Sequence, residues 1–330
     1  MRDKKGLILQ IIGITTLLFI VFKDKEQFIT ILNTADLSYL PQIAFYSYLA
    51  ILFSGIGFVL VARLFEIKVK TIALLPIAIL SIVINNLMAF GGVAGFSLRI
   101  VMLKRYDIKA RLVIAASLFH MYLYTIGITA FIPFSLIHIF NNYVLSPRQY
   151  HTLVALSYTS FIIFCLATIV LLFSQVRKIV LLGTEKVLKV FSKKSLSESF
   201  ANFDLVLSTG IKSATKKFWI FPLLVLIVIA DYGSASLALG YCFKAFNISL
   251  GRFSIFSGMV VGASAGIISM IPGGLGVQEA SMSEIFKFMG VPFNTTFLVS
   301  LLFRAVFYLV PFALALTSLF VINRRKKILG

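Results

Sequence analysis

Four charged side chains interrupt long apolar runs of the sequence: Arg99, Asp231, Glu279 and Arg304. A charge at the centre of a bilayer costs about 3 kcal/mol on insertion scales, so such side chains usually face a cavity or one another. A guanidinium can bind phosphate through two parallel hydrogen bonds. These residue types therefore indicate binding and translocation of a charged group, and we assign no catalytic residue.

Each of these charges also has a structural interpretation. Glu279 follows an expected helix start, where the helix dipole favours a carboxylate. Arg99 could extend to the cytoplasmic edge of the membrane beside Lys104. Arg304 and Asp231 could form an ion pair between two spans, and this is the interpretation that we favour for them.

Uncharged polar residues accompany the charges. Asn86 and Gln278 are the two that we add to the substrate-binding set. His120 is expected to be a packed or hydrogen-bonded helix residue, because no metal-ligand spacing surrounds it. Cys165 and Cys242 each lie inside an apolar run, so neither a disulfide framework nor a thiolate metal site is predicted. No phosphate-binding Gly-x-x-x-x-Gly-Lys-Ser/Thr loop exists, and no cofactor is predicted.

The composition predicts an all-α polytopic membrane protein. Hydrophobic residues make up 59% of the 330 residues, and charged residues only 13%, which is far from the balance of a soluble domain. The apolar runs are continuous and about twenty residues long, unlike the alternating segments of a membrane barrel. We therefore expect about six transmembrane helices together with two re-entrant helical hairpins.

Basic residues predict how these helices cross the membrane. The expected crossings are residues 6–22 (kept as an uncleaved first span), 41–62, 111–134, 152–176, 218–243 and 297–321. Lysines and arginines near both ends of the chain place both termini in the cytoplasm by the positive-inside rule. The net charge of +19 is then explained by this rule and by anionic lipid headgroups, and nucleic acid is not an expected partner. The expected location is the cytoplasmic membrane.

Residues 177–217 are expected to connect an N-terminal membrane half, 1–176, to a C-terminal half, 218–330. The connector holds nine basic and three acidic residues, so we place it in the cytoplasm. Apolar residues at spacings of three and four over 196–214 predict a helix along the membrane surface, with Ser195 and Glu198 as a capping box. The alternative is a connector packed against the bundle.

Two glycine-rich interruptions predict the hairpins, over residues 72–103 and 253–289. The first should open to the cytoplasm, because a single crossing would leave several basic residues outside, and the second should open to the other face. The expected turn residues are Gly91, Gly92 and Gly95 in the first, and Pro272, Gly273, Gly274 and Gly276 in the second. Opposite topology predicts an inverted repeat with a binding site near the membrane midplane. Glycines spaced by four before the second turn, Gly258, Gly262 and Gly266, predict a close helix-packing face.

Two motifs resemble those of a known family. P-G-G-L-G-V-Q-E-A at 272–280, followed by L-L-F-R-A-V-F-Y-L-V-P-F at 301–312, is similar to the lysylphosphatidylglycerol synthase transmembrane family. The segment 84–99, I-N-N-L-M-A-F-G-G-V-A-G-F-S-L-R, is similar to that family's first signature. The resemblance implies movement of phospholipids, aminoacylated ones included, or of other lipid-linked headgroups between leaflets. Fused members also carry a soluble transferase domain that has no counterpart in these motifs, so we do not expect this chain to be an enzyme.

The leading hypothesis is a lipid flippase or scramblase whose partners are phospholipids with anionic or zwitterionic headgroups. The alternative is a membrane subunit that presents lipid to a separate glycosyl- or aminoacyl-transferase. A homo-oligomer or a partner transferase is compatible with either. An intramembrane enzyme is the least favoured class, because neither a His-Glu-x-x-His nor a Gly-x-Ser-x-Gly motif is present.

Overall fold

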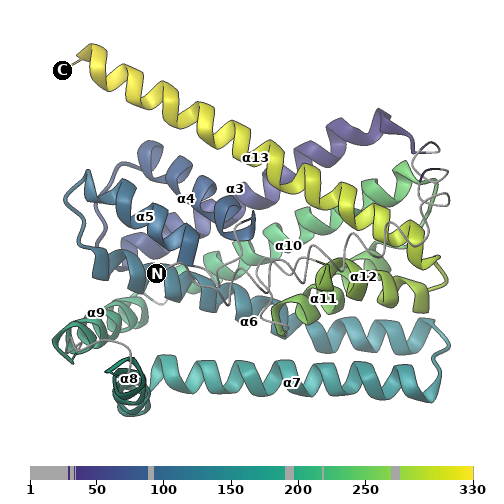
Figure 1. The fold of residues 1–330 in the computed structure, drawn as a ribbon, viewed down its shortest axis with the longest axis horizontal. Helices are drawn as coiled ribbons and strands as arrows, with labels where there is room; N and C mark the ends of the chain where they lie inside the picture. Colours follow the sequence, from purple (N-terminus) through teal and green to yellow (C-terminus); the bar gives the residue numbers. More distant parts are fainter. Residues whose placement is uncertain are drawn as a thin grey trace.

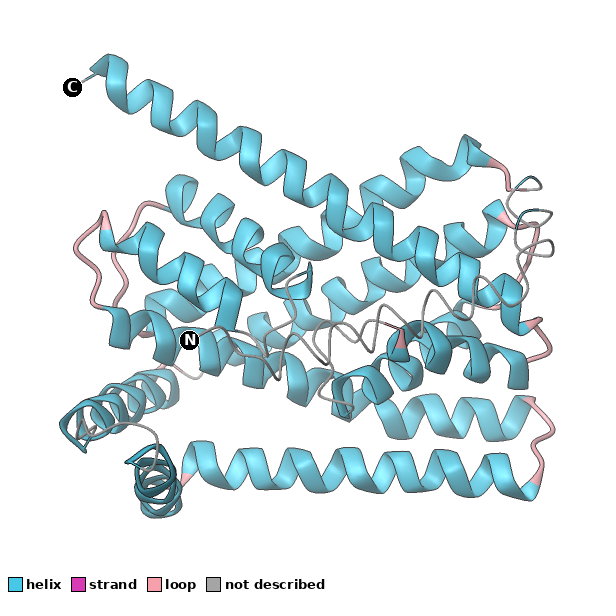
Figure 2. Ribbon diagram, viewed as in Figure 1, coloured by secondary structure: helices cyan, strands magenta, loops and turns pink. Residues whose placement is uncertain are grey.

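The computed structural model describes residues 35–87, 93–189, 197–217, 219–268 and 276–329, together with the single residues 29 and 33. Within these ranges every regular element is a helix and there is no strand (Figures 1 and 2). The elements are the 3-10 helix η1 (Leu37–Tyr39) and the α-helices α3 (Leu40–Leu64), α4 (Thr71–Leu87), α5 (Val93–Lys104), α6 (Ala110–Asn142), α7 (Pro147–Leu172), α8 (Ser174–Lys189), α9 (Ser197–Lys216), α10 (Ile220–Ala245), α11 (Arg252–Ile268), α12 (Val277–Phe288) and α13 (Phe293–Leu329). The predicted all-α polytopic class is confirmed.

Five helices in the described ranges are long and apolar enough to cross a membrane. They are Leu37–Leu64, Ala110–Asn142, Pro147–Val170, Ile220–Ala245 and Phe293–Ser318. Each matches one of the six expected crossings, and the remaining one, 6–22, lies outside the described residues. Apolar run length therefore located these spans correctly.

The ends of α6 and α7 differ from the expected ones. We expected the outward crossing to end at residue 134 and the next to begin at 152, but only residues 143–146 separate the two helices. Hydrogen bonds at the junction explain the difference. The Ser146 backbone N–H donates to Gln149 Oε1 at 2.7 Å, and Pro147 occupies the first turn of α7. This is a capping arrangement that starts a helix without any change in hydrophobicity.

Four short helices, α4, α5, α11 and α12, form two pairs whose outer loops lie at opposite ends of the bundle. In Figure 1 the loops before α4 and after α5 lie at the left end, and the loops before α11 and after α12 lie at the right end. Helix α4 packs against α5, and α11 packs against α12. The expected turn residues Gly91, Gly92, Pro272, Gly273 and Gly274 lie outside the described residues.

Two of the expected turn glycines can be located. Gly276 has a φ of 78° and immediately precedes α12, a backbone conformation that glycine adopts without strain. Gly95 is instead inside α5, so its assignment to the turn is wrong. A Cβ on Gly95 would lie 2.3 Å from the carbonyl oxygen of Ser81. This glycine therefore lets α5 approach α4 closely.

The connector contains two helices where the sequence predicted one. Helix α8 is seen end-on in Figure 1, so it runs across the direction of α7. Helix α9 packs against α6 and α3, with Leu207 buried and Gly210 against the ring of Phe65. Arg177 joins α8 to α9 through Asp204 and through a 2.6 Å hydrogen bond to Ser208. Helix α9 is thus packed against the bundle, whereas α8 exposes Ile179 and Leu182. The position of the connector along the membrane surface stays a prediction, and Ser195 lies outside the described residues.

The two halves of the chain pack crosswise. Helix α10 lies along α3 at the centre, α4 packs on α13, and α11 packs on α6. The glycines of α11 face α12: an added Cβ would approach the Phe286 ring from Gly258, the Met282 backbone from Gly262 and Gln278 from Gly266. The predicted close-packing face is confirmed.

Gly262→Ala should destabilise the protein, because the new Cβ would lie 2.9 Å from the Met282 Cα and helix α12 would have to move. Gly233→Ala on α10 is the matched control, since nothing lies within 4 Å of its added Cβ. Relative to this control, Gly262→Ala should lose about 1–3 kcal/mol, the usual cost of overpacking. Thermal unfolding in detergent measures the difference, and equal stabilities of the two variants would contradict the close contact.

Candidate functional site

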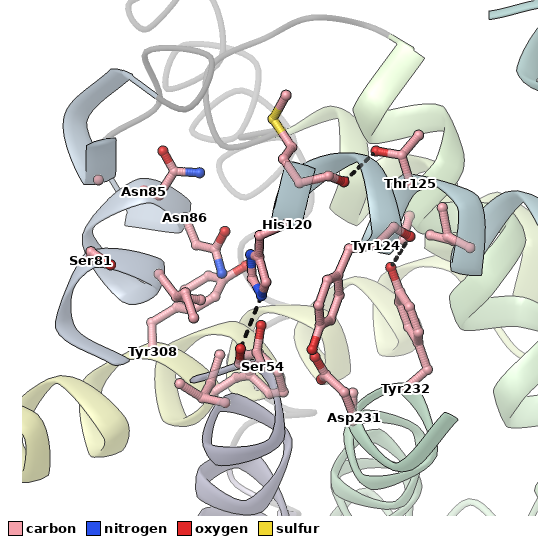
Figure 3. Close-up of a pocket in the computed structure, with 18 of the residues that line it drawn as sticks. Ser54, Ser81, Asn85, Asn86, His120, Tyr124, Thr125, Asp231, Tyr232 and Tyr308 are labelled. Carbon is pink, nitrogen blue, oxygen red and sulfur yellow. Dashed lines mark hydrogen bonds between the residues drawn. The ribbon is translucent and has the colours of Figure 1, made fainter. Parts of the chain in front are cut away.

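A cavity of about 410 Å³ lies where both short helix pairs meet the long spans. Helices α3, α4, α5, α6, α10, α11, α12 and α13 all contribute to its wall. Its polar lining residues are Ser54, Ser81, Asn85, Asn86, Arg99, Ser117, His120, Tyr124, Thr125, Asp231, Tyr232, Gln278 and Tyr308 (Figure 3). The remaining lining is mainly apolar, as in most small-molecule sites.

Arg99 is the positive charge of this cavity. It is 3% exposed, and its Nε and Nη1 atoms donate to the hydroxyl oxygens of Ser81 at 2.6 Å and Ser117 at 3.0 Å. Its guanidinium carbon lies 3.8 Å from the ring centroid of Phe58. Arg99 therefore points into the bundle, and the idea that it extends to the membrane edge beside Lys104 is wrong.

The partners of Arg99 are neutral. No carboxylate of the described residues lies within ion-pair distance of its guanidinium. A guanidinium has five N–H donors, and the two hydroxyls accept only part of them. The arrangement leaves a buried cation that can bind an anion.

Two asparagines of α4 add uncharged polar groups on the same side. Figure 3 shows Ser81, Asn85 and Asn86 together on one side of the cavity. The side-chain oxygen of Asn85 is buried without a hydrogen-bond partner among the described residues. A buried polar atom of this kind usually binds water or a ligand, so this side of the cavity can accept as well as donate hydrogen bonds.

Asp231 is the acidic residue of the cavity and lies on the other side in Figure 3. The figure shows the Tyr124 hydroxyl directed toward Asp231, and the Tyr232 hydroxyl donates to the Tyr124 carbonyl at 3.2 Å. No lysine or arginine of the described ranges lies within 4.0 Å of this carboxylate. His120, between the two sides, donates from Nε2 to the carbonyl of Ser54 at 3.0 Å, as expected for a hydrogen-bonded helix residue.

Glu279 and Arg304 form an ion pair with each other, so the expected Arg304–Asp231 pair is wrong. Glu279 is 2% exposed, and its second carboxylate oxygen accepts the Gly276 N–H at 2.8 Å. The carboxylate thus anchors the start of α12 to α13. Neither residue lines the cavity, although the Tyr308 ring, 5.6 Å from the Arg304 guanidinium carbon, does.

The structure therefore divides the expected site residues into two groups. Arg99, Asp231, Asn86 and Gln278 share the cavity, and Glu279 with Arg304 lies outside it. The hydroxyl groups around Arg99 and the tyrosines around Asp231 were not expected. Only Tyr124 had a usable signal, because it follows His120 by four residues and so shares a helix face with it. No group of His, Cys, Asp or Glu in the described part of the chain could hold a metal ion.

Glu279→Gln should destabilise the protein by about 3–5 kcal/mol, because it removes the carboxylate that forms an ion pair with the buried Arg304 guanidinium. The double variant Glu279→Gln, Arg304→Met should recover part of this loss, since the guanidinium is then removed together with the carboxylate. Thermal unfolding in detergent provides the comparison.

The control for this pair is Glu284→Gln. Glu284 has a side chain 47% exposed that lies 3.6 Å from Lys287 on the surface of α12, and exposed pairs contribute at most about 1 kcal/mol. A Glu279→Gln variant as stable as Glu284→Gln would contradict the structural importance of the buried pair.

Comparison with known proteins identifies relatives of the chain. The family model described as "Lysylphosphatidylglycerol synthase TM region" matches residues 7–315. Proteins named phosphatidylglycerol lysyltransferase from Staphylococcus aureus strains MRSA252 and COL are 30% identical over 91 residues. That match covers 28% of this chain and only 11% of each relative.

Proposed function

Because the chain belongs to the family of lysylphosphatidylglycerol synthase transmembrane regions, we propose that it is a multi-pass membrane protein that moves phospholipids between the two leaflets. The observation that carries the proposal is the buried Arg99 guanidinium, whose hydrogen-bond partners in the described structure are two hydroxyl groups and which has no ion-pair partner there. A cation at this depth is costly and usually marks a substrate path. A phospholipid supplies the anion that such a site lacks, since its phosphate can accept two parallel N–H bonds.

Arg99 and Asp231 together support a zwitterionic headgroup, with Asp231 ionised when an ammonium group lies beside it. Arg99 bonds to Ser81 on one side, and Asp231 lies on the other side in Figure 3. A headgroup that carries phosphate and an ammonium group complements both charges, whereas a purely anionic one complements only the first. Aminoacylated phospholipids fall in the favoured class.

The arrangement of the short helices supports an inverted repeat of two re-entrant hairpins. The α4–α5 pair opens to one end of the bundle and packs on α13, and the α11–α12 pair opens to the other end and packs on α6. Transporters with this symmetry expose a midplane site alternately to each side by rocking one repeat against the other. The cavity between the two pairs is then the site of exchange.

Basic residues support the orientation of the protein in the membrane. Arg63, Lys68 and Lys70 surround the loop before α4, and Lys104, Arg105 and Lys109 surround the loop after α5. Both loops lie at the same end of the bundle (Figure 1). The positive-inside rule makes this end cytoplasmic.

Transport is also proposed in preference to aminoacyl transfer. The lysyltransferase activity in the names of the relatives belongs to proteins that this chain matches over 11% of their length. The cavity offers groups that bind a headgroup: a guanidinium, hydroxyls, amides and a carboxylate.

Arg99→Met should slow lipid movement by at least about tenfold, the effect of losing one charged hydrogen bond. Arg99→Lys should be intermediate, because an ammonium binds phosphate as a point charge without the two parallel bonds. The assay uses purified protein in liposomes with a fluorescent headgroup lipid, quenched from outside by an impermeant reductant. Lys104→Met, an exposed charge on the same helix, is the control. Wild-type protein that moves no tested lipid would overturn the function.

Asp231→Asn should reduce movement of lipids with a headgroup amine more than movement of phosphatidylglycerol, because only the amine uses the carboxylate. The same liposome assay, run with amine-bearing and amine-free lipids side by side, measures the ratio of the two rates. An equal loss for both lipids would contradict a role for Asp231 in headgroup recognition.

A further inference from the structure

A second cavity, also of about 410 Å³, lies between α6, α7, α8 and α9. Its lining includes Leu118, Met121 and Thr125 of α6, Ala167 of α7, and Val180 and Leu181 of α8. The transport argument does not use this cavity. Its size lies within the range of about 300–1,000 Å³ that is usual for sites of small molecules.

The few polar groups of this second cavity already have partners inside the protein. The Tyr122 hydroxyl donates to Thr168 at 3.0 Å, and the Thr125 hydroxyl donates to the Met121 carbonyl at 3.0 Å. Arg177 is bonded to Asp204 and Ser208 of α9. A polar ligand would therefore find no free group to orient it.

The second cavity adjoins the central one. Met121 and Thr125, one turn apart on α6, line both cavities. The Met121 side chain is flexible and apolar, and such a residue adapts readily to neighbouring groups. An amphiphile with its headgroup in the central cavity can therefore reach the second cavity past these two residues.

Two other contents of the second cavity are less favourable. Ordered water needs several polar partners, and the polar groups of this largely apolar cavity are already bonded. An empty cavity of this size leaves its wall without dispersion contacts on one side. In a membrane the apolar species at highest concentration is the acyl chain, which needs no hydrogen bond.

We propose that the second cavity is a binding slot for one acyl chain of the lipid whose headgroup occupies the central cavity. The identity of that headgroup rests on the proposed function, whereas the residues that line the slot do not depend on it. Helices α6, α7 and α8 would then bind part of the lipid's tail during exchange, and Met121 with Thr125 would separate headgroup from tail.

A photoreactive lipid tests the slot. Full-length protein is reconstituted with phosphatidylglycerol that carries a diazirine near the end of one acyl chain, irradiated and digested, and the labelled residues are mapped by mass spectrometry. Labels are expected on residues 118–125 of α6 and 180–181 of α8, in excess over the outer residues of α7. Labels spread along the whole exposed length of α7, as for surrounding bilayer lipid, would overturn the proposal.

Ala167→Trp, which adds bulk to the slot, should reduce the α6 and α8 labels by at least about tenfold. Ala155→Trp is the matched control, because this alanine is also exposed on α7 but does not line the cavity. Unchanged labels in a folded Ala167→Trp protein would contradict the slot, and the wild-type map decides the question if that variant does not fold. Labels in the slot without lipid movement would overturn the proposed function alone, and lipid movement without slot labels would overturn this inference alone.

Discussion

The rest of this structure depends on one constraint. Polar groups inside the apolar bundle must find hydrogen-bond or ion-pair partners within the protein, because the bilayer core supplies no water. Glu279 meets the requirement twice, since it accepts the N–H of Gly276, just before α12, and neutralises Arg304. Arg177 of α8 and Asp204 of α9 form the corresponding buried ion pair in the connector. Arg99 meets it only in part, because its partners are uncharged. The central cavity lies where the protein alone satisfies a buried charge incompletely.

Much of the fold could be predicted from the sequence, because the positions of spans and of helix-contact faces follow from the order and spacing of residue types. Apolar runs located five spans, and four-residue glycine spacing located the face of α11 that contacts α12. The errors involve local hydrogen bonds and shape. Ser146 starts α7 by capping, within a stretch that reads as a loop. Gly95 allows α5 to approach α4 closely. The sequence alone does not distinguish such a glycine from one in a turn.

The site was predictable in its charges but not in their partners. Arg99 and Asp231 stood out because charge is rare in apolar runs, and both line the cavity. The pairing of Arg304 depends on where a broken helix restarts, and this brings Glu279 rather than Asp231 within reach. Ser81 and Ser117 each lie eighteen positions from Arg99 and resemble any other helix serine. Such contacts arise only from the packing of three helices.

The hydroxyl groups around Arg99 take the place of water, because they accept hydrogen bonds from its guanidinium. The Ser81 hydroxyl accepts from the guanidinium with a lone pair while it donates its own proton to the Ala78 carbonyl at 2.7 Å, so it solvates the cation without carrying a charge. A carboxylate in their place would compete with any anion that enters the cavity. In the proposed carrier, neutral partners would keep the loaded and unloaded forms close in free energy. A carrier needs this balance, because it must release what it binds on the far side.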